Sequence, residues 1–416
     1  MKKLVYPLLI ACFLLILPGC GTKKEADGLE ISSNVEFGKE DYQRIVSSQN
    51  ELGFDWLQHV VADKNENVII SPASLFMALS MAYNGADGVT KDEIAKVLHV
   101  GGLNNSELNK ANASLMSMLH NNSEKVQLNV ANSIWLNNNY HFQDDFSKNN
   151  KDYFNAKIQE IDIKNPNAPD KINGWVKKAT NNNIKDLVDA PLSSDLITIL
   201  INAVYFKGNW QYEFDKKHTV KKTFHLKDGA TKKVPLMKLN KELDYLETED
   251  FQAVALPYGD GETSMVVFLP KENTRLDEFQ KKLNSDNWKQ WQAQFKPRQG
   301  TIMLPKFTFE HEIELYDTLE KLGMKSAFTS DANFSKMVKE TIPIQISEVK
   351  QKTFIDVNEK GTEAAAATSV TMTKASVPSG EPFQMEVNRP FFFAIVDNNT
   401  TAILFMGAIS DPTEAK

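Results

Sequence analysis

The side chains best suited to catalysis or metal binding are seven histidines and two cysteines, and their spacing supports neither chemistry. No two histidines stand three or four residues apart, the spacing that places paired zinc ligands on one face of a helix. The nucleophile pattern G-x-S-x-G is absent, and so is a glycine-rich phosphate-binding loop. We therefore expect no enzyme activity, no cofactor and no metal ion.

A segment that follows the strand-like stretch 344–357 has a different capacity, because its residues are small enough to move between packed strands. Gly361 can act as a pivot, and the alanines offer almost no side chain to clash on insertion. Alanine is a poor former of a permanent strand, so the composition favours a strand that forms by movement. A flexible or partly helical linker is the alternative interpretation. The segment, called the hinge below, comprises Glu359, Lys360, Gly361, Thr362, Glu363, Ala364, Ala365, Ala366, Ala367 and Thr368.

The hinge continues into a stretch rich in Ser, Thr, Pro and Gly that ends near residue 381. About 25 residues without a core pattern are long for a loop inside a compact domain. Such loops often carry function, because a rigid scaffold presents them to partners. We therefore expect the functional site in this part of the chain.

The rest of the chain has ordinary globular composition, with 42% apolar and 24% charged residues. This excludes global disorder. The net charge of −7, from 47 basic and 54 acidic side chains, offers no general surface for polyanions. No basic stripe with interleaved aromatic residues is found, so we expect no nucleic acid partner.

The first 19 residues have the pattern of a secretory signal. Lys2 and Lys3 precede an apolar run of 14 residues, too short for the roughly 20 that span a bilayer as a helix. Leu17-Pro18-Gly19-Cys20 resembles a bacterial lipoprotein cleavage site, so Cys20 would carry a lipid as the only membrane contact. We expect a cell-envelope lipoprotein, or a secreted protein as the alternative. Residues 20–45 are expected to form a polar tether and residues 46–412 the folded domain.

The predicted domain has a mixed pattern of helices and strands without an internal repeat. Ser71-Pro72 predicts a helix start, and Thr90 with Glu93 predicts a capping box for a second helix. Residues 196–206 are apolar almost throughout and predict a strand buried on both faces, with Asn202 needing internal hydrogen bonds. Two hairpins are expected, over 253–269 and 391–409. Strands joined by hairpins and helices clustered early indicate an α+β fold.

An ordered set of short motifs extends from about residue 50 to 412. It comprises Asn67-Val68-Ile69-Ile70-Ser71-Pro72-Ala73-Ser74, the stretch Asn202 to Trp210, Leu256-Pro257-Tyr258, Leu269-Pro270-Lys271, Leu304-Pro305-Lys306-Phe307, Leu322-Gly323-Met324, the hinge, Asn388-Arg389-Pro390-Phe391 and Leu404-Phe405-Met406-Gly407. In this order the motifs resemble the serpins, a family of serine-protease inhibitors. The resemblance implies a single α+β domain with a large central mixed sheet, two smaller sheets, clustered helices and an exposed reactive-centre loop at about 359–385.

The same resemblance implies a mechanism of inhibition. A target protease cleaves the loop, the hinge inserts into the central sheet, and the acyl-enzyme is trapped before hydrolysis. The partner would be a serine protease of elastase-like, subtilisin-like or trypsin-like specificity, and cysteine proteases would be cross-inhibited by the same route. We expect the inhibitor itself to be a monomer.

The resemblance also assigns roles to particular residues. Ala375 is the seventeenth residue counted from Glu359, so the reactive bond is expected between Ala375 and Ser376, or one residue earlier between Lys374 and Ala375. The region where the central sheet opens is expected to contain Ser71, Ser74, Asn202, Trp210 and Gln351. Many relatives carry a histidine at the position of Gln351. Glutamine hydrogen-bonds but does not titrate, so an acid-triggered opening is not expected there.

Two other functions remain as alternatives to inhibition. A serpin that acts as a carrier or chaperone would usually have proline or bulky charged residues in its hinge, and this hinge has none. A lipoprotein solute-binding receptor would agree with the signal sequence. That receptor would require two βαβ lobes, and it would give no reason for an alanine-rich hinge.

Overall fold

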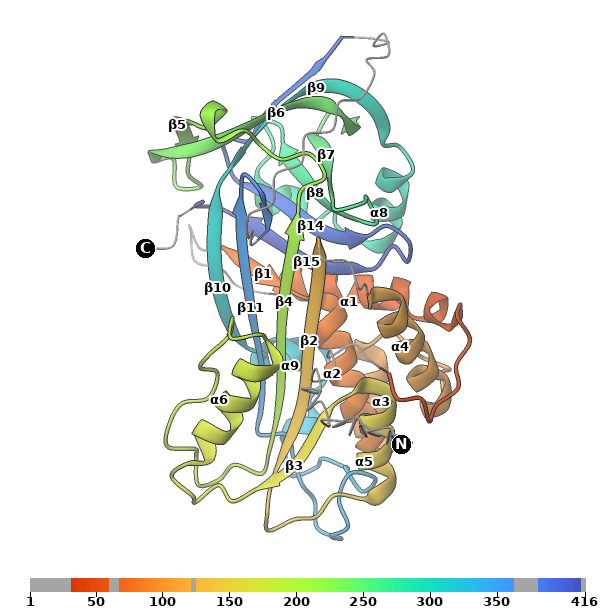
Figure 1. Cartoon of the computed structure of the whole chain (residues 1–416). Helices are drawn as coiled ribbons and strands as arrows, with labels where there is room; N and C mark the ends of the chain where they lie inside the picture. The colour runs from red at the N-terminus through yellow and green to blue at the C-terminus, as the bar shows by residue number, and fades with distance from the viewer. Residues whose placement is uncertain (1–30, 60–66, 121–124, 363–380, 413–416) are drawn as a thin grey trace, which may run out of the picture.

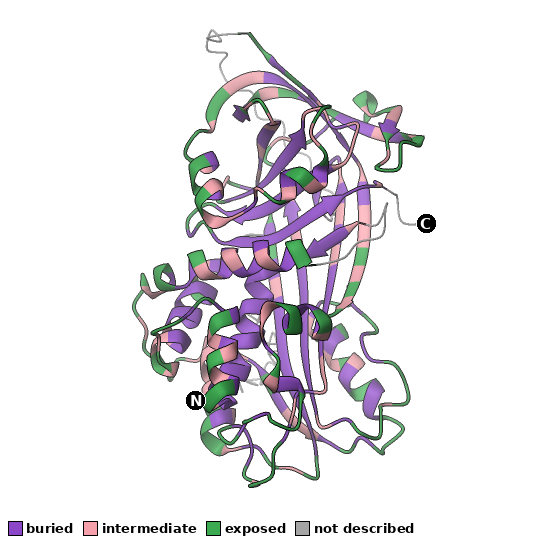
Figure 2. Cartoon of the chain, turned by 180° about the vertical axis from the view of Figure 1, so that it is seen from behind, coloured by how far each residue is buried: buried purple, intermediate pink, exposed green. Residues whose placement is uncertain are grey.

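Two β-sheets and a group of helices make up the computed structural model, which describes residues 31–59, 67–120, 125–362 and 381–412 (Figure 1). Most strands are buried along much of their length, and most helices have one buried and one exposed side (Figure 2). Helix α2 (Pro72–Gly85) is the exception, because all of its residues are buried. The helices are α1 (Val46–His59), α2 (Pro72–Gly85), α3 (Gly88–Val97), α4 (Asn105–Leu119), α5 (Asp144–Phe154), α6 (Ala168–Ala179), α7 (Leu276–Gln280), α8 (Ser285–Gln292) and α9 (Tyr316–Leu322), with 3-10 turns η1 (Asp41–Arg44), η2 (Lys216–His218) and η3 (Ser326–Phe328).

The central sheet is mixed and has six strands in the order β10-β11-β12-β4-β2-β3. Strand β4 pairs antiparallel with β2 and parallel with β11, which places Asn202 between Asn132 and Gln351. The strands are β2 (Val126–Asn137), β3 (Lys157–Ile161), β4 (Thr198–Asn209), β10 (Phe307–Glu314), β11 (Glu348–Asn358) and β12 (Gly361–Thr362).

The two faces of the central sheet are buried against different partners, because successive side chains of a strand point to opposite sides. On β4, Leu200, Val204 and Phe206 join the large core that includes α2 and the second sheet. Ile199, Ile201 and Ala203 instead pack with a smaller core that includes residues of α6. As predicted, β4 is therefore buried on both faces and reads as a nearly continuous apolar run.

The second sheet has nine strands, eight of them in the order β1-β15-β14-β8-β7-β6-β9-β13, with β5 paired to β6. The two expected smaller sheets are joined here, because the 17-residue strand β6 pairs first with β5, then with β9 and finally with β7. The strands are β1 (Val68–Ile70), β5 (Val220–His225), β6 (Thr231–Glu247), β7 (Phe251–Tyr258), β8 (Thr263–Pro270), β9 (Lys296–Pro305), β13 (Phe383–Glu386), β14 (Phe391–Asp397) and β15 (Ile403–Ile409).

Helix α2 begins as predicted, with Ser71 as N-cap and Pro72 in the first turn. The predicted capping box for α3 is wrong. Asp87 is the N-cap, because Thr90 is buried and hydrogen-bonded to Ser326, while Glu93 accepts hydrogen bonds from the neighbouring turn η3. Thr90 and Glu93, which the local pattern assigned to the cap, therefore bind residues distant in sequence instead.

The α+β class with a large mixed central sheet and both predicted hairpins is confirmed. The prediction of a tether up to residue 45 is wrong for its last part. Tyr42 and Ile45 are buried, and the amide of Tyr42 donates to the Ser114 hydroxyl of α4 at 3.1 Å. The expected signal, Cys20 and most of the reactive-centre loop lie outside the described residues. Among the described helices, none has the length and apolarity required to cross a membrane.

Candidate functional site: the seam of the central sheet and the start of the hinge

Strands β4 and β11 pair directly along residues 199–205 and 348–354, and this boundary is called the seam below. Beyond it the two parallel strands diverge. The gap is filled by β12, in which Thr362 lies opposite Val357 and Gly208, and Gly361 lies opposite Asn358 and Asn209. The first residues of the hinge are thus already a short third strand at one end of the seam.

Only glycine fits at position 361. A Cβ atom there would lie 2.0 Å from the carbonyl oxygen of Gly208 and 2.6 Å from the Cα of Asn209. Both contacts are with backbone, which cannot swing aside as a flexible side chain would. The pivot suggested by the sequence is therefore also a point of close approach between two strands.

Thr362 is fully buried, and its side chain faces the large core. Its hydroxyl lies 2.7 Å from that of Tyr258, whose ring stacks on Trp210 with centroids 4.3 Å apart. Burial raises the pKa of Tyr258 far above its usual range, so the phenol keeps its proton. Trp210 holds the turn before β12, because its Nε1 donates a hydrogen bond to the carbonyl oxygen of Asn358 at 2.9 Å.

Glu359 is buried although it is acidic, and polar neighbours offset that burial. Its carboxylate accepts a hydrogen bond from the Thr219 hydroxyl at 3.0 Å and lies 3.4 Å from Lys306 Nζ. Burial by itself raises the Glu359 pKa, but its own backbone N–H, the Thr219 hydroxyl and Lys306 together hold that pKa below its usual range. The carboxylate is therefore charged at neutral pH and anchors the base of the hinge.

A row of three amide side chains crosses the middle of the seam. Gln351 Nε2 donates to Asn202 Oδ1 at 2.6 Å, and Asn202 Nδ2 donates to Asn132 Oδ1 at 2.7 Å. Helix α2 covers this row with its N-terminus. The Ser71 amide donates to Gln351 Oε1 at 3.0 Å, and Ser74 accepts from Asn202 through its carbonyl oxygen, at 3.1 Å, and through its hydroxyl.

The row is incompletely satisfied. Asn202 has two amide hydrogens for three acceptors, so at least one bond is shared. The Asn132 amide nitrogen is buried and has no hydrogen-bond partner among the described residues. A buried polar group without a partner costs about 1–3 kcal/mol. The seam is therefore held together by interactions that carry a local energetic penalty.

The structure brings the predicted residues together in two clusters on one face of the sheet. Ser71, Ser74, Asn202 and Gln351 form the row, whereas Trp210 contacts the hinge about 26 Å further along β4, at 3.3 Å per residue. The other predicted site residues lie outside the described residues: Glu363, Ala364, Ala365, Ala366, Ala367, Thr368, Lys374, Ala375 and Ser376.

Sequence analysis missed Asn132, Tyr258, Thr219 and Lys306. Asn132 had a usable signal, because it is the one polar residue in the alternating apolar series formed by positions 126, 128, 130, 132, 134 and 136. Tyr258 and Lys306 stood in two of the short motifs without a role assigned to them, and Thr219 had no signal. They reach the hinge from β7, from the residue before β5 and from the residue between β9 and β10, which no local pattern connects.

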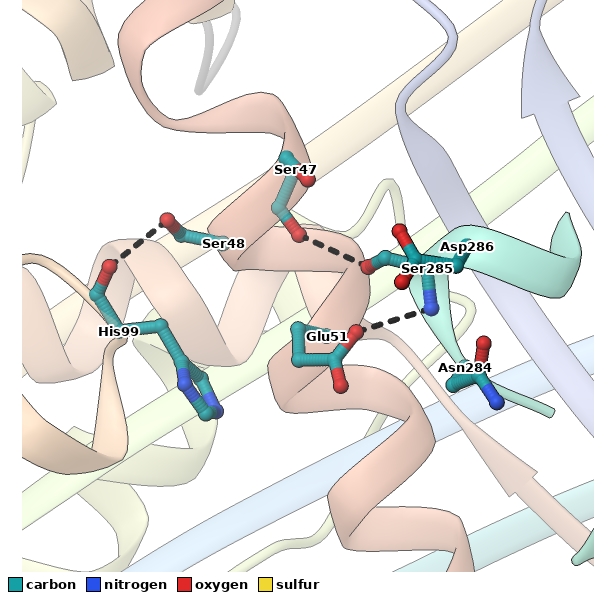
Figure 3. Close-up of a pocket in the computed structure, with 7 residues that line it drawn as sticks. All are labelled: Ser47, Ser48, Glu51, His99, Asn284, Ser285 and Asp286. Atoms are coloured by element: carbon teal, nitrogen blue, oxygen red, sulfur yellow. Dashed lines mark hydrogen bonds between the residues drawn. The ribbon is translucent and has the colours of Figure 1, made fainter. Parts of the chain in front are cut away.

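A second candidate is a polar pocket of about 320 Å³ between α1, the loop after α3 and the start of α8 (Figure 3). Its lining groups already bind one another. Glu51 accepts from the Ser285 amide at 2.9 Å, and the Ser48 hydroxyl donates to the carbonyl of His99 at 2.8 Å. Across the described part of the chain, no cluster of three or more His, Cys, Asp or Glu side chains could hold a metal ion. The pocket therefore gives no chemistry that competes with the seam.

The central sheet has a seam between two parallel strands, and residues 361 and 362 of the hinge pair with both strands at one end of it. Residues 47–412 match the profile of the family described as serpin (serine protease inhibitor). An uncharacterized serpin-like protein of Methanosarcina mazei is 33% identical over 88% of this chain and 87% of its own length. Human Serpin B4 is 32% identical over 88% of this chain and 99% of its own length. The chain belongs to the serpin family, whose members generally inhibit proteases.

Solved structures agree with this assignment. The native state of tengpin, a thermophilic serpin, matches with a TM-score of 0.81 and 33% identity over 93% of this chain and 99% of that one. Native protease nexin-1, solved with heparin, matches with a TM-score of 0.78 and 30% identity over 89% of this chain and 100% of that one. The predicted fold and family are thereby confirmed, and the receptor alternative is excluded because its two βαβ lobes are not the fold observed.

Proposed function

We propose that this chain is an inhibitory serpin that traps a serine protease after the protease cleaves the loop beyond residue 362. The observation that carries the proposal is β12, because its two residues already pair with both strands of the seam. Strand insertion then requires extension of an existing strand rather than formation of a new one. No catalytic group is needed, because the protease supplies the chemistry and the inhibitor supplies a conformational change.

The register of β12 supports this proposal when it is extended into the seam. Thr362 lies opposite Val357 and Gly208, so an inserted Thr368 would lie opposite Gln351 and Asn202. Its hydroxyl can both donate and accept, and can therefore replace the Gln351–Asn202 hydrogen bond that insertion breaks. The amide row is thus matched to the one hydroxyl-bearing residue that would reach it.

The distribution of charge along the hinge is consistent with the same register. Alternate residues would face the large core with Thr362, namely Ala364, Ala366, Thr368, Val370 and Met372. None is charged, and the first two are too small to clash. Glu363 falls on the opposite face, toward α6, where the strand would not bury it in the large core. Lys374 is the first charged residue on the core-facing side, close to the expected reactive bond.

Insertion of about a dozen residues adds ladder hydrogen bonds worth roughly 1 kcal/mol net each, or on the order of 10 kcal/mol.

We propose Ala375–Ser376 as the reactive bond, with Lys374–Ala375 as the alternative. A small residue before the bond suits an elastase-like or subtilisin-like pocket, and a lysine suits a trypsin-like pocket. We further propose export as a lipoprotein through Cys20, which mass spectrometry of the mature N-terminus would test.

The test is to mix the chain with elastase, trypsin and subtilisin and to look for an SDS-resistant complex. Sequencing of the released peptide identifies the bond. A Thr362→Arg variant should be cleaved without trapping, because the arginine would drive residue 362 out of its buried place in β12 and insertion would have to bury the unpaired charge, at a cost of several kcal/mol. Thr341→Arg, at an exposed position outside both sheets, serves as the matched control and should trap normally.

Stoichiometric trapping by Thr362→Arg would contradict the insertion mechanism. Cleavage without any complex from the wild-type chain would favour a carrier or chaperone instead. A second measurement compares heat resistance. The cleaved wild-type chain should unfold at a much higher temperature than the intact chain, because the added strand completes the central sheet.

A further inference from the structure

The modest net charge of the chain conceals one strongly basic region. Residues 216–241 contain nine lysines and one aspartate, whereas the remainder of the chain has 38 basic and 53 acidic side chains. This region comprises η2, β5 and the first part of β6. Lys216, Lys217, Lys221, Lys227, Lys233 and Lys238 are all exposed.

The two faces of the β5–β6 hairpin differ in how their charges are used. On the inner face, Lys222 pairs with Glu386 at 2.5 Å, and Lys232 pairs with Asp411. On the outer face, Lys221 and Lys233 lie beside Thr223, to which Lys233 donates a hydrogen bond at 2.8 Å. Neither Lys221 nor Lys233 forms an ion pair with another described residue.

The hairpin that presents this outer face is attached to both ends of the reactive-centre loop. Thr219, the residue before β5, binds Glu359 at the base of the hinge, and Lys222 binds Glu386 in the strand that follows the loop. The amide of His225 also donates to the carbonyl of Asn388 at 2.8 Å. A protease engaged with the loop must therefore sit next to this hairpin.

We propose that the outer face of the β5–β6 hairpin, centred on Lys221 and Lys233, is a docking surface for proteases that are acidic around their active site. The inference rests on the proposed function and names the class of target. Fixed charges of one sign beside a binding site steer an oppositely charged partner and raise its association rate by ten-fold or more.

A nucleic acid fits this surface less well than a protein. The only Phe, Tyr or Trp between positions 216 and 241 is Phe224, which is fully buried, so this surface presents none of the large aromatic rings on which bases of a single strand usually stack. The Lys222–Glu386 pair and the Thr219–Glu359 hydrogen bond fix the hairpin against the two ends of the loop, and this position serves a partner that also contacts the loop.

The experiment uses one protease in two forms, native subtilisin and subtilisin with its surface lysines succinylated. For the wild-type chain, we expect loop cleavage by the succinylated form to be faster by about ten-fold relative to native subtilisin at low salt. The advantage should disappear near 1 M salt, where the screening length is about 3 Å. The double variant K221E/K233E should lose the advantage.

The control variant K157E/K164E makes the same change of charge at exposed lysines near β3, at the opposite end of the molecule from β5 (Figure 1). It should keep the wild-type preference. An equal preference in all three chains overturns the docking surface. Tighter heparin binding by the wild-type chain than by K221E/K233E, without any preference for succinylated subtilisin, also overturns it and indicates a polyanion site.

Loop cleavage is measured separately from trapping, so the two proposals fail in different ways. A preference for succinylated subtilisin without an SDS-resistant complex would leave the docking surface standing and reject the inhibitor. SDS-resistant complexes that form at equal rates with both forms of subtilisin would support the inhibitor and reject the docking surface.

Discussion

The interior of the nine-stranded sheet and the seam of the central sheet are both buried, yet they are built from different side chains. Phe268 of β8 is fully buried and lies 5.4–5.6 Å, centroid to centroid, from Phe251, Phe279 and Trp288. The seam instead has Asn132, Asn202 and Gln351 in a row across three strands. One region is closed by apolar packing, and the other by amide hydrogen bonds.

Under the proposed function, the difference follows from what each region must do. Apolar packing is strong and non-directional, so strands held by it separate only when the domain unfolds. Directional hydrogen bonds can be exchanged for equivalent ones with an incoming strand, at little net change in free energy. A row of polar side chains is therefore a suitable closure for a seam that opens. A region that stays closed gains nothing from hydrogen bonds that can be exchanged.

The largest expected effect comes from the apolar region. Phe268→Ala should lower the free energy of unfolding by about 3–5 kcal/mol, because it leaves a cavity among aromatic rings. Denaturant unfolding of intact and loop-cleaved chains should show the same loss in both. The half-buried neighbour Phe295 is the control, and its alanine variant should lose less. A loss confined to the intact form would contradict the separation of the two regions.

Asn202→Ala should have the next largest effect, about 1–3 kcal/mol for each partner left unpaired. The intact chain should lose more than the cleaved chain, because Asn202→Ala leaves Gln351 without this partner in the intact chain, whereas in the cleaved chain the inserted Thr368 hydroxyl would be the partner of Gln351. Asn132→Ala removes only the outer member of the row and should cost less. If Asn202→Ala affected the cleaved chain as strongly as the intact one, the row would not be a closure of the seam.

Gly361→Ala should expel β12 from its place between β4 and β11, at a cost of about 1–3 kcal/mol for the overpacked contact. Trp210 fluorescence reports this change, because its ring stacks on Tyr258 and its Nε1 binds the turn before β12. Gly174→Ala in α6 is the matched control, since no atom lies within 4 Å of its added Cβ. An unchanged spectrum for Gly361→Ala would show that the hinge does not need glycine there.

The smallest effect concerns pH. The folded pKa of Glu359 lies below its unfolded value, so its contribution to stability is complete above an ordinary carboxyl pKa of about 4.3. That contribution is lost as pH falls through the lowered folded pKa. The difference in melting temperature between wild type and Glu359→Gln should therefore be larger at neutral pH than in acid. A difference that grew on acidification would reverse the sign and exclude the anchor.

The sequence was informative where a local pattern and the tertiary structure agree. The apolar run around Asn202, the two hairpins and the start of α2 at Ser71 all formed as predicted, because alternation, turns and caps depend on neighbouring residues. The cap of α3 failed for the opposite reason. Thr90 and Glu93 hydrogen-bond to η3, more than 200 residues away along the chain.

The sequence by itself indicated which segment is suited to insertion, because residues 361–368 are glycine, threonine and alanine apart from Glu363 and are therefore small. The tertiary structure decided where that segment begins, at the end of the seam. Tyr258, Thr219 and Lys306 meet the hinge from three separate parts of the chain. Composition acts through each residue's own size and charge, whereas these contacts depend on sheet pairing between distant strands, and that pairing is fixed only when the whole core packs.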